Sequence, residues 1–219
     1  MEKSPKLPLT NDVKRNIMEF HKKTKRSLRY ASYDFCYSYF YENKGHLAED
    51  MQRSCFILWS YLASWGMLRN SKLLECSPAA LEPLIHYFDK DLALWNIDVK
   101  DYNDEYIRKK LINVYNVIAL ILRKKVFWKK SKADSDEEDI PTVTLVTKIM
   151  LGVYGNVPAF DQYFKNTFHK VFGGFTSCRQ IGEKEILSLY KFYTKYTNLL
   201  YVQLLPKMNV INFEGDKLE

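Results

Sequence analysis

The sequence predicts an all-α protein, a globular bundle of seven to nine helices with no substantial sheet. Large apolar residues recur at steps of three and four through most of the chain, which is the helical period. The Asn-Gly and Asp-Gly pairs typical of tight hairpins are absent, and no long internal repeat is visible. With 219 residues, 47% of them hydrophobic and 15% aromatic, the chain can bury a substantial core.

The first expected helix starts at Thr10 or Asn11, either of which can act as the N-cap. Its apolar residues keep helical spacing as far as Leu28, with Lys and Arg on the opposite face. Residues 29–41, RYASYDFCYSYFY, contain too many aromatic residues for a surface helix. We expect a buried helix there, with a strand as the less favoured alternative. Residues 46–68 predict a long apolar helix with acids in its first turn.

Gly66 lies within that expected helix, where glycine costs about 1 kcal/mol relative to alanine. Close approach of a second helix would explain it, and a nearby ligand is the alternative. Ser77 and Pro78 are typical of an N-cap and first turn. Helical spacing then predicts further helices at 78–88, 102–125, 141–151, 158–172 and 182–204.

The net charge of +7 is concentrated at the amino end, because residues 1–30 hold nine basic residues against three acids. A second basic run begins at Arg123 and is followed by the acidic run DSDEED at 134–139. Blocks of like charge repel and do not pack, so we expect a charged linker at 129–140. The linker would join a helical domain, 1–128, to a C-terminal helical subdomain, 141–219, packed on the first.

Basic clusters of this kind favour DNA or RNA as a partner, because lysine and arginine can follow a phosphate backbone. Two alternatives remain open: a solvated helix face, and an interaction subunit that binds an acidic protein. The candidate nucleic-acid contacts are Lys22, Lys23, Lys25, Arg26, Lys124 and Lys125.

The sequence also indicates what the protein lacks. No apolar run is long enough for a membrane span, and the amino end lacks the apolar core of a signal peptide, so we expect a cytoplasmic protein. Cysteines and histidines show no metal-ligand spacing, and nucleotide-loop, acyl-transfer and zinc-protease motifs are absent. We expect neither a metal nor a cofactor, and whether the protein is an enzyme stays open.

Two aromatic stretches supply a candidate pocket. Asp34 is surrounded by aromatic residues, and an unpaired buried carboxylate is very unfavourable, so we expect an ion pair with Arg29 or Arg69. The alternative is a small-molecule enzyme whose pocket uses the same residues. The candidate pocket residues are Arg29, Tyr30, Asp34, Trp65 and Arg69.

The stretch TKIMLGVYGNVPAFDQYF, residues 147–164, resembles the catalytic half of helix-hairpin-helix DNA glycosylases. In that family a helix with a Thr-Lys pair is followed by a turn containing proline and by an essential aspartate at a helix start. The resemblance implies that Lys148 attacks the sugar carbon, that Asp161 stabilises the sugar cation, and that the target base is flipped into an aromatic pocket. Two departures are a missing Gly-rich hairpin before the lysine and a short spacing of 13 residues to the aspartate.

The same stretch also has a purely structural interpretation. In it Gly152 ends one helix, Pro158 begins the next, and Asp161 in the first turn complements the helix dipole. Together with RYASYDFCYSYF and YLASWGMLRNS, the stretch resembles an uncharacterised group of bacterial all-α proteins with no assigned activity. That resemblance covers most of the chain and implies no function.

Overall fold

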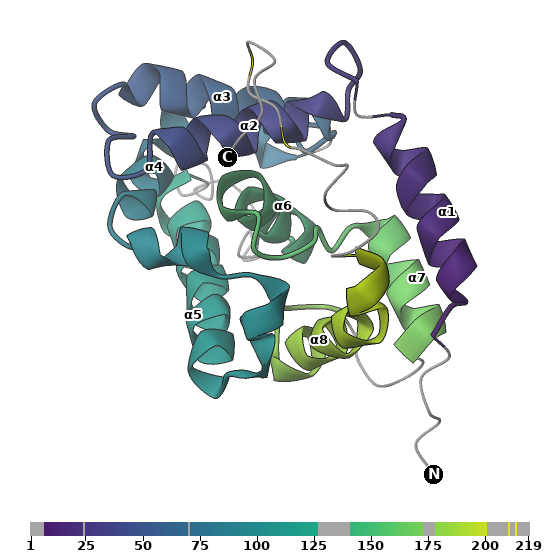
Figure 1. The fold of residues 1–219 in the computed structure, drawn as a ribbon. Coiled ribbons are helices and arrows are strands. Elements are labelled where there is room, and N and C mark those ends of the chain that lie inside the picture. Colours follow the sequence, from purple (N-terminus) through teal and green to yellow (C-terminus); the bar gives the residue numbers. More distant parts are fainter. Residues whose placement is uncertain are drawn as a thin grey trace, which may run out of the picture.

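A computed structural model describes residues 7–23, 25–69, 71–126, 141–172 and 178–200 together with Val210 and Phe213. For residues 125 and 126 it describes the backbone alone. Within these residues the all-α prediction is confirmed, because eight α-helices occur and no strand does (Figure 1). The expected linker at 129–140 lies outside the described residues.

The α-helices follow one another with short helical segments between them. They are α1 (Thr10–His21), α2 (Ala31–Glu42), α3 (Met51–Ser64), α4 (Glu82–Phe88), α5 (Glu105–Ile121), α6 (Val143–Tyr154), α7 (Gln162–Phe172) and α8 (Glu183–Asn198). The 3-10 segments are η1 (Lys72–Glu75), η2 (Pro78–Leu81), η3 (Leu92–Asn96) and η4 (Val99–Asn103), and α5 continues into a π-helical segment, η5 (Leu122–Val126).

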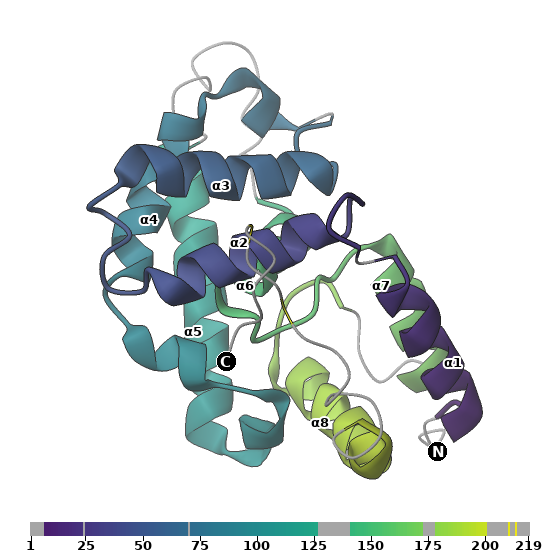
Figure 2. The ribbon, with the colours of Figure 1, turned by 45° about the horizontal axis from the view of Figure 1, so that its top comes forward.

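Helix α6 lies at the centre of the bundle and packs against α2, α3 and α5 (Figures 1 and 2). Ten of its twelve residues are buried. A helix that is apolar on all sides is stable only when it is surrounded by other elements. Apart from its lysine, the sequence VTLVTKIMLGVY is of this kind. That lysine, Lys148, is buried with the rest of the helix.

Most buried apolar side chains form one cluster, which runs from Cys36 on α2 to Ile186 on α8. A second, small cluster joins Val13 of α1 to Tyr196 and Leu199 at the end of α8. The Tyr196 hydroxyl also donates a hydrogen bond to the Pro8 carbonyl. Helix α1 is thereby fixed to the far end of the chain, and α7 runs beside it in both views (Figures 1 and 2).

The first helix is shorter than the sequence predicts. It ends at His21 and not near Leu28, and its N-cap is Leu9, with no side-chain cap from Thr10 or Asn11. The basic residues that follow therefore lie in the connection to α2. The buried helix expected at 29–41 is confirmed as α2, which excludes the strand alternative.

The long helix expected at 46–68 is also shorter. Helix α3 begins only at Met51, because the Asp50 side chain accepts a hydrogen bond from the Arg53 amide. At its other end Gly66 adopts a positive φ of 75°. The Gly66 amide bonds to the Ala63 carbonyl and the Met67 amide to the Leu62 carbonyl, which closes the helix in a Schellman motif.

The close helix approach expected at Gly66 occurs at Gly152 instead. Nothing lies within 4 Å of a Cβ built on Gly66, whereas a Cβ on Gly152 would lie 2.4 Å from Cε1 of Tyr61. The structural interpretation of residues 147–164 is also wrong in two details. Gly152 lies inside α6, which ends at left-handed Gly155, and Pro158 precedes α7 by several residues.

Candidate functional site

Thr147 fixes the segment between α6 and α7. Its hydroxyl donates to the Val143 carbonyl at 2.8 Å and accepts from the Phe160 amide at 2.8 Å. One turn earlier, the Thr144 hydroxyl donates to the Phe160 carbonyl at 2.8 Å. Both backbone groups of Phe160 are thus bonded to α6, and this places the next residue, Asp161, close to Lys148.

Lys148 is buried, with only 4% of its surface exposed. Its Nζ donates to the Trp65 carbonyl at 3.0 Å and lies 5.1 Å from the centre of the Trp65 ring. Trp65 is the C-cap of α3, where carbonyl groups lack helical partners and a positive charge complements the helix dipole. The buried Lys148 side chain therefore caps the C-terminal end of α3.

Burial lowers the pKa of Lys148, the Asp161 carboxylate acts in the opposite direction, and Arg29 lowers it further. Asp161 itself is the N-cap of α7, since its Oδ1 accepts from the Phe164 amide at 2.9 Å. No ion pair within 4.0 Å joins the two residues. The structure brings them into electrostatic range, and each is bonded to a backbone group.

An aromatic group lies between this lysine and the surface; we call Phe20, Tyr30 and Trp65 the ring cluster. The Phe20 and Tyr30 ring centres are 5.1 Å apart, the Tyr30 and Trp65 centres are 5.3 Å apart, and both pairs meet edge to face. The exposed Arg29 guanidinium lies 5.1 Å from the Tyr30 ring and 5.5 Å from the Trp65 ring. Trp65 therefore contacts one exposed cation and one buried cation.

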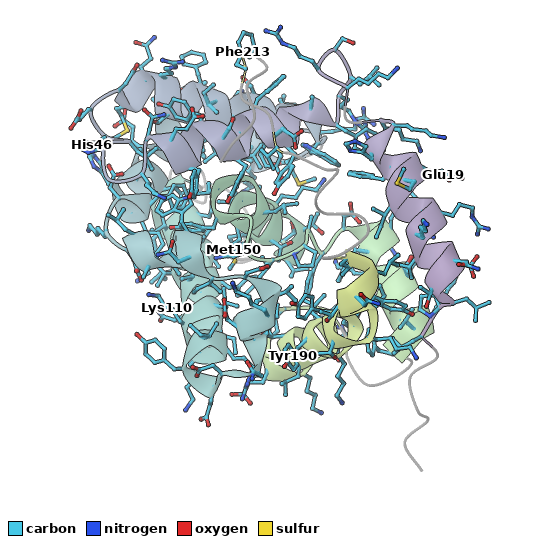
Figure 3. All side chains as sticks on the ribbon, in the orientation of Figure 1. Glu19, His46, Lys110, Met150, Tyr190 and Phe213 are labelled. Carbon is cyan, nitrogen blue, oxygen red and sulfur yellow. The ribbon has the colours of Figure 1, made fainter. Side chains whose placement is uncertain are left out.

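Five cations lie in the connection between α1 and α2, all of them exposed; we call Lys22, Lys23, Lys25, Arg26 and Arg29 the basic turn. In the described part of the chain none of them forms an ion pair with an acid. Arg26 donates to the Phe213 carbonyl at 2.5 Å and lies over the Phe213 ring. Phe213 and the basic turn accordingly share one edge of the molecule (Figure 3).

The second basic group expected from the sequence lies elsewhere. Lys124 is exposed in η5, which packs on η2, and the side chain of Lys125 is outside the described residues. In both ribbon views the end of α5 lies beside α4, away from the connection between α1 and α2 (Figures 1 and 2). The structure does not bring the two basic groups together.

The candidate pocket residues also separate. Arg29, Tyr30 and Trp65 are in contact, but Asp34 forms no ion pair with Arg29 or Arg69, so that expectation is wrong. The Arg29 guanidinium lies over the Tyr30 and Trp65 rings instead. Burial raises the pKa of Asp34 from 3.8 to about 6.

Two residues of the site were missed in the sequence. Phe20 is 50% exposed, although it belongs to the apolar spacing of the first expected helix. Tyr61 is buried, and its hydroxyl donates to the Lys148 carbonyl at 3.1 Å. The spacing of four between Tyr61 and Trp65 places both on one face of α3, which is the one signal that could have found it.

No family model, curated protein or solved structure matches this chain. In the described residues no group of three His, Cys, Asp or Glu is placed to hold a metal ion. None of the helices described here has the length and apolar character needed to cross a membrane. The geometry of the basic turn, the ring cluster and Lys148 is therefore the basis for the functional proposal.

Proposed function

We propose that the protein binds nucleic acid through the basic turn, in a repair or defence role. The observation that carries the proposal is a run of five exposed cations within residues 22–29, none of which forms an ion pair with an acid in the described part of the chain. A solvated helix face does not account for them, because α1 ends at His21 and they lie beyond it. Cations arranged in this way neutralise successive phosphates and release counterions.

The test replaces the charge of the basic turn. In the test variant Lys22, Lys23, Lys25 and Arg26 are all changed to Gln. A matched control removes the same number of Lys and Arg charges from other exposed positions, namely Arg53, Lys90, Lys100 and Lys195. Both variants have the same net charge, so a difference between them reports position and not overall electrostatics.

Binding of labelled DNA and RNA is measured by fluorescence anisotropy between about 50 and 200 mM salt. We expect the test variant to bind more weakly and with a shallower salt dependence, and the control to stay close to the wild type. Equal binding by the two variants would contradict the proposal. If the wild type binds no nucleic acid but captures an acidic protein in a salt-dependent way, the interaction-subunit alternative replaces it.

A glycosylase-like activity is the second candidate, and the surroundings of Lys148 favour it. The amine is buried, its pKa is lowered, and the Asp161 carboxylate is near enough to affect it. A lowered pKa raises the fraction of neutral amine, which is the nucleophilic form. In the reaction implied by the family resemblance, the amine nitrogen would bond to the sugar carbon. The base would leave with the electron pair of its bond and take up the proton that the attached amine loses.

This second candidate is tested with oligonucleotides carrying different damaged bases, followed by mass spectrometry of the released bases. Lys148→Gln and Asp161→Asn should each abolish release, because both act on the transition state, and Asp161→Asn should leave oligonucleotide binding within about twofold. Release that persists in Lys148→Gln would show that the lysine only closes α3.

A further inference from the structure

The ring cluster gives the basic turn an apolar neighbour that phosphate binding does not require. Phe20, near the end of α1, keeps half of its surface exposed while its ring contacts Tyr30. Leu28, in the connection between α1 and α2, is exposed as well. Exposed apolar groups beside a row of cations suit a ligand that has both negative charge and accessible apolar faces. The chemistry of the surface therefore restricts the class of nucleic acid.

We infer that this surface binds single-stranded nucleic acid, with unpaired bases stacked on Phe20 and Tyr30 and phosphates on the basic turn. The inference rests on the proposed nucleic-acid binding and goes beyond it by naming the form of the ligand. In a duplex the base faces are covered by their neighbours, so the half-exposed Phe20 ring and the partly buried Tyr30 ring gain no stacking partner. A single strand offers a π-face at every base, whatever the sequence.

Arg29 links the two components of the surface. Its guanidinium lies over the Tyr30 ring at 5.1 Å and over the Trp65 ring at 5.5 Å, and it is exposed. A planar guanidinium stacks on aromatic faces and also donates to phosphate oxygens, which lysine cannot do in the same way. Arg29 can therefore contact a phosphate while it stays close to both rings.

The rings are held in place from inside the protein. Tyr30 packs on Trp65, and the Trp65 ring and carbonyl both contact the buried amine of Lys148. Ser64, next to Trp65, shares a hydrogen bond of 2.7 Å with Ser32 of α2, so the end of α3 is fixed to the start of α2. A ring cluster fixed before binding loses little conformational freedom when a base stacks on it.

The experiment compares Phe20→Ala with Phe56→Ala, a matched control on α3 with the same residue type and an exposure of 51% against 50%. Tyr30→Leu and Arg29→Lys are the second and third test variants. Each is titrated with a labelled oligothymidylate of about 16 nucleotides and with a duplex of about the same length. Thermal unfolding followed by circular dichroism confirms that each variant is folded.

We expect the wild type to prefer the single strand, and Phe20→Ala and Tyr30→Leu each to weaken it about tenfold with an unchanged salt slope. Arg29→Lys should weaken it as well, although the charge is kept. Phe56→Ala should bind like the wild type. Duplex binding equal to single-strand binding, or ring variants that match Phe56→Ala, would overturn the inference and leave the proposed function standing. Failure to bind either oligonucleotide would overturn both.

Discussion

Two buried ionisable residues give the stability of this protein opposite dependences on pH. Asp34 is 8% exposed and no cation in the described residues pairs with it, so burial favours its neutral form. Lys148 is also buried, and burial favours its neutral amine. Burial therefore disfavours the charged form of each residue, and single substitutions can separate the two effects.

For Asp34→Asn the effect follows from the pKa, which is raised from 3.8 to about 6. The folded state binds the proton more tightly than the unfolded state, so the wild type loses stability as the pH rises through that interval. We expect the variant to be more stable than the wild type by roughly 1 kcal/mol at pH 7, a value reduced for residual solvent, with no difference near pH 4. Urea unfolding across this range measures it, and Glu42→Gln controls for the loss of one negative charge on α2.

For Lys148→Met the sign is reversed. The folded pKa lies below the usual 10.5, so in the interval between them the unfolded state binds more protons and wild-type stability rises with pH. We expect the unfolding free energy of the wild type to increase relative to the variant as the pH approaches 10.5. Lys100→Met, at an exposed position, is the control. If the difference in unfolding free energy between the wild type and Lys148→Met does not change with pH, the amine is not desolvated.

At the scale of single elements, the contact between α3 and α6 depends on a glycine. A Cβ at position 152 would lie 2.4 Å from Cε1 of Tyr61, and the ring is held because its hydroxyl bonds to the Lys148 carbonyl. The two helices can approach this closely because one of them presents no side chain at that point.

We expect Gly152→Ala to lower the unfolding free energy by about 1–3 kcal/mol, the range for overpacking a core. In that background Tyr61→Leu should cost less than it does in the wild type, because it relieves the clash. Gly66→Ala provides the contrast: it should cost about 1 kcal/mol through its positive φ and be additive with Tyr61→Leu. Additive energies for the first pair, measured by urea unfolding, would show that the ring moves aside freely.

Helical periodicity predicted which segments are helical but not where the helices end. Helix α3 starts at Met51 because Asp50 caps it, and α1 stops at His21 although apolar spacing continues. Part of the site could also be predicted from the sequence, since Lys148 and Asp161 lie within electrostatic range of each other. The bond from Lys148 to Trp65 joins residues 83 positions apart in the chain, and no local pattern carries that information.

At the scale of the whole molecule, α6 lies beyond the charged segment 129–140 and yet packs on α2, α3 and α5. Its buried side chains belong to the same cluster as those of α2 through α5. Separating the two parts would expose this helix, which is buried on nearly every side, to water. Burial of that apolar surface should hold the parts together without a covalent link.

A protease site inserted within 129–140 tests this expectation. After cleavage we expect both fragments to elute together at the size of the intact chain in size-exclusion chromatography. They should separate only in denaturant, because separation would expose the apolar surface of α6 to water. The uncleaved insertion variant is the control, and fragments that separate in native buffer would contradict the expectation.

The hydrogen bond from the Phe160 amide to the Thr147 hydroxyl protects a loop amide from solvent in the way that helical hydrogen bonds protect the amides inside a helix. Phe160 lies outside every helix, yet it is 1% exposed and its amide is bonded to a buried oxygen on α6. Exchange of that amide with deuterium from solvent therefore requires α6 and the loop to part. The Phe160 amide should exchange as slowly as the amides of α6 itself, so one non-helical residue reports how often the centre of the protein opens.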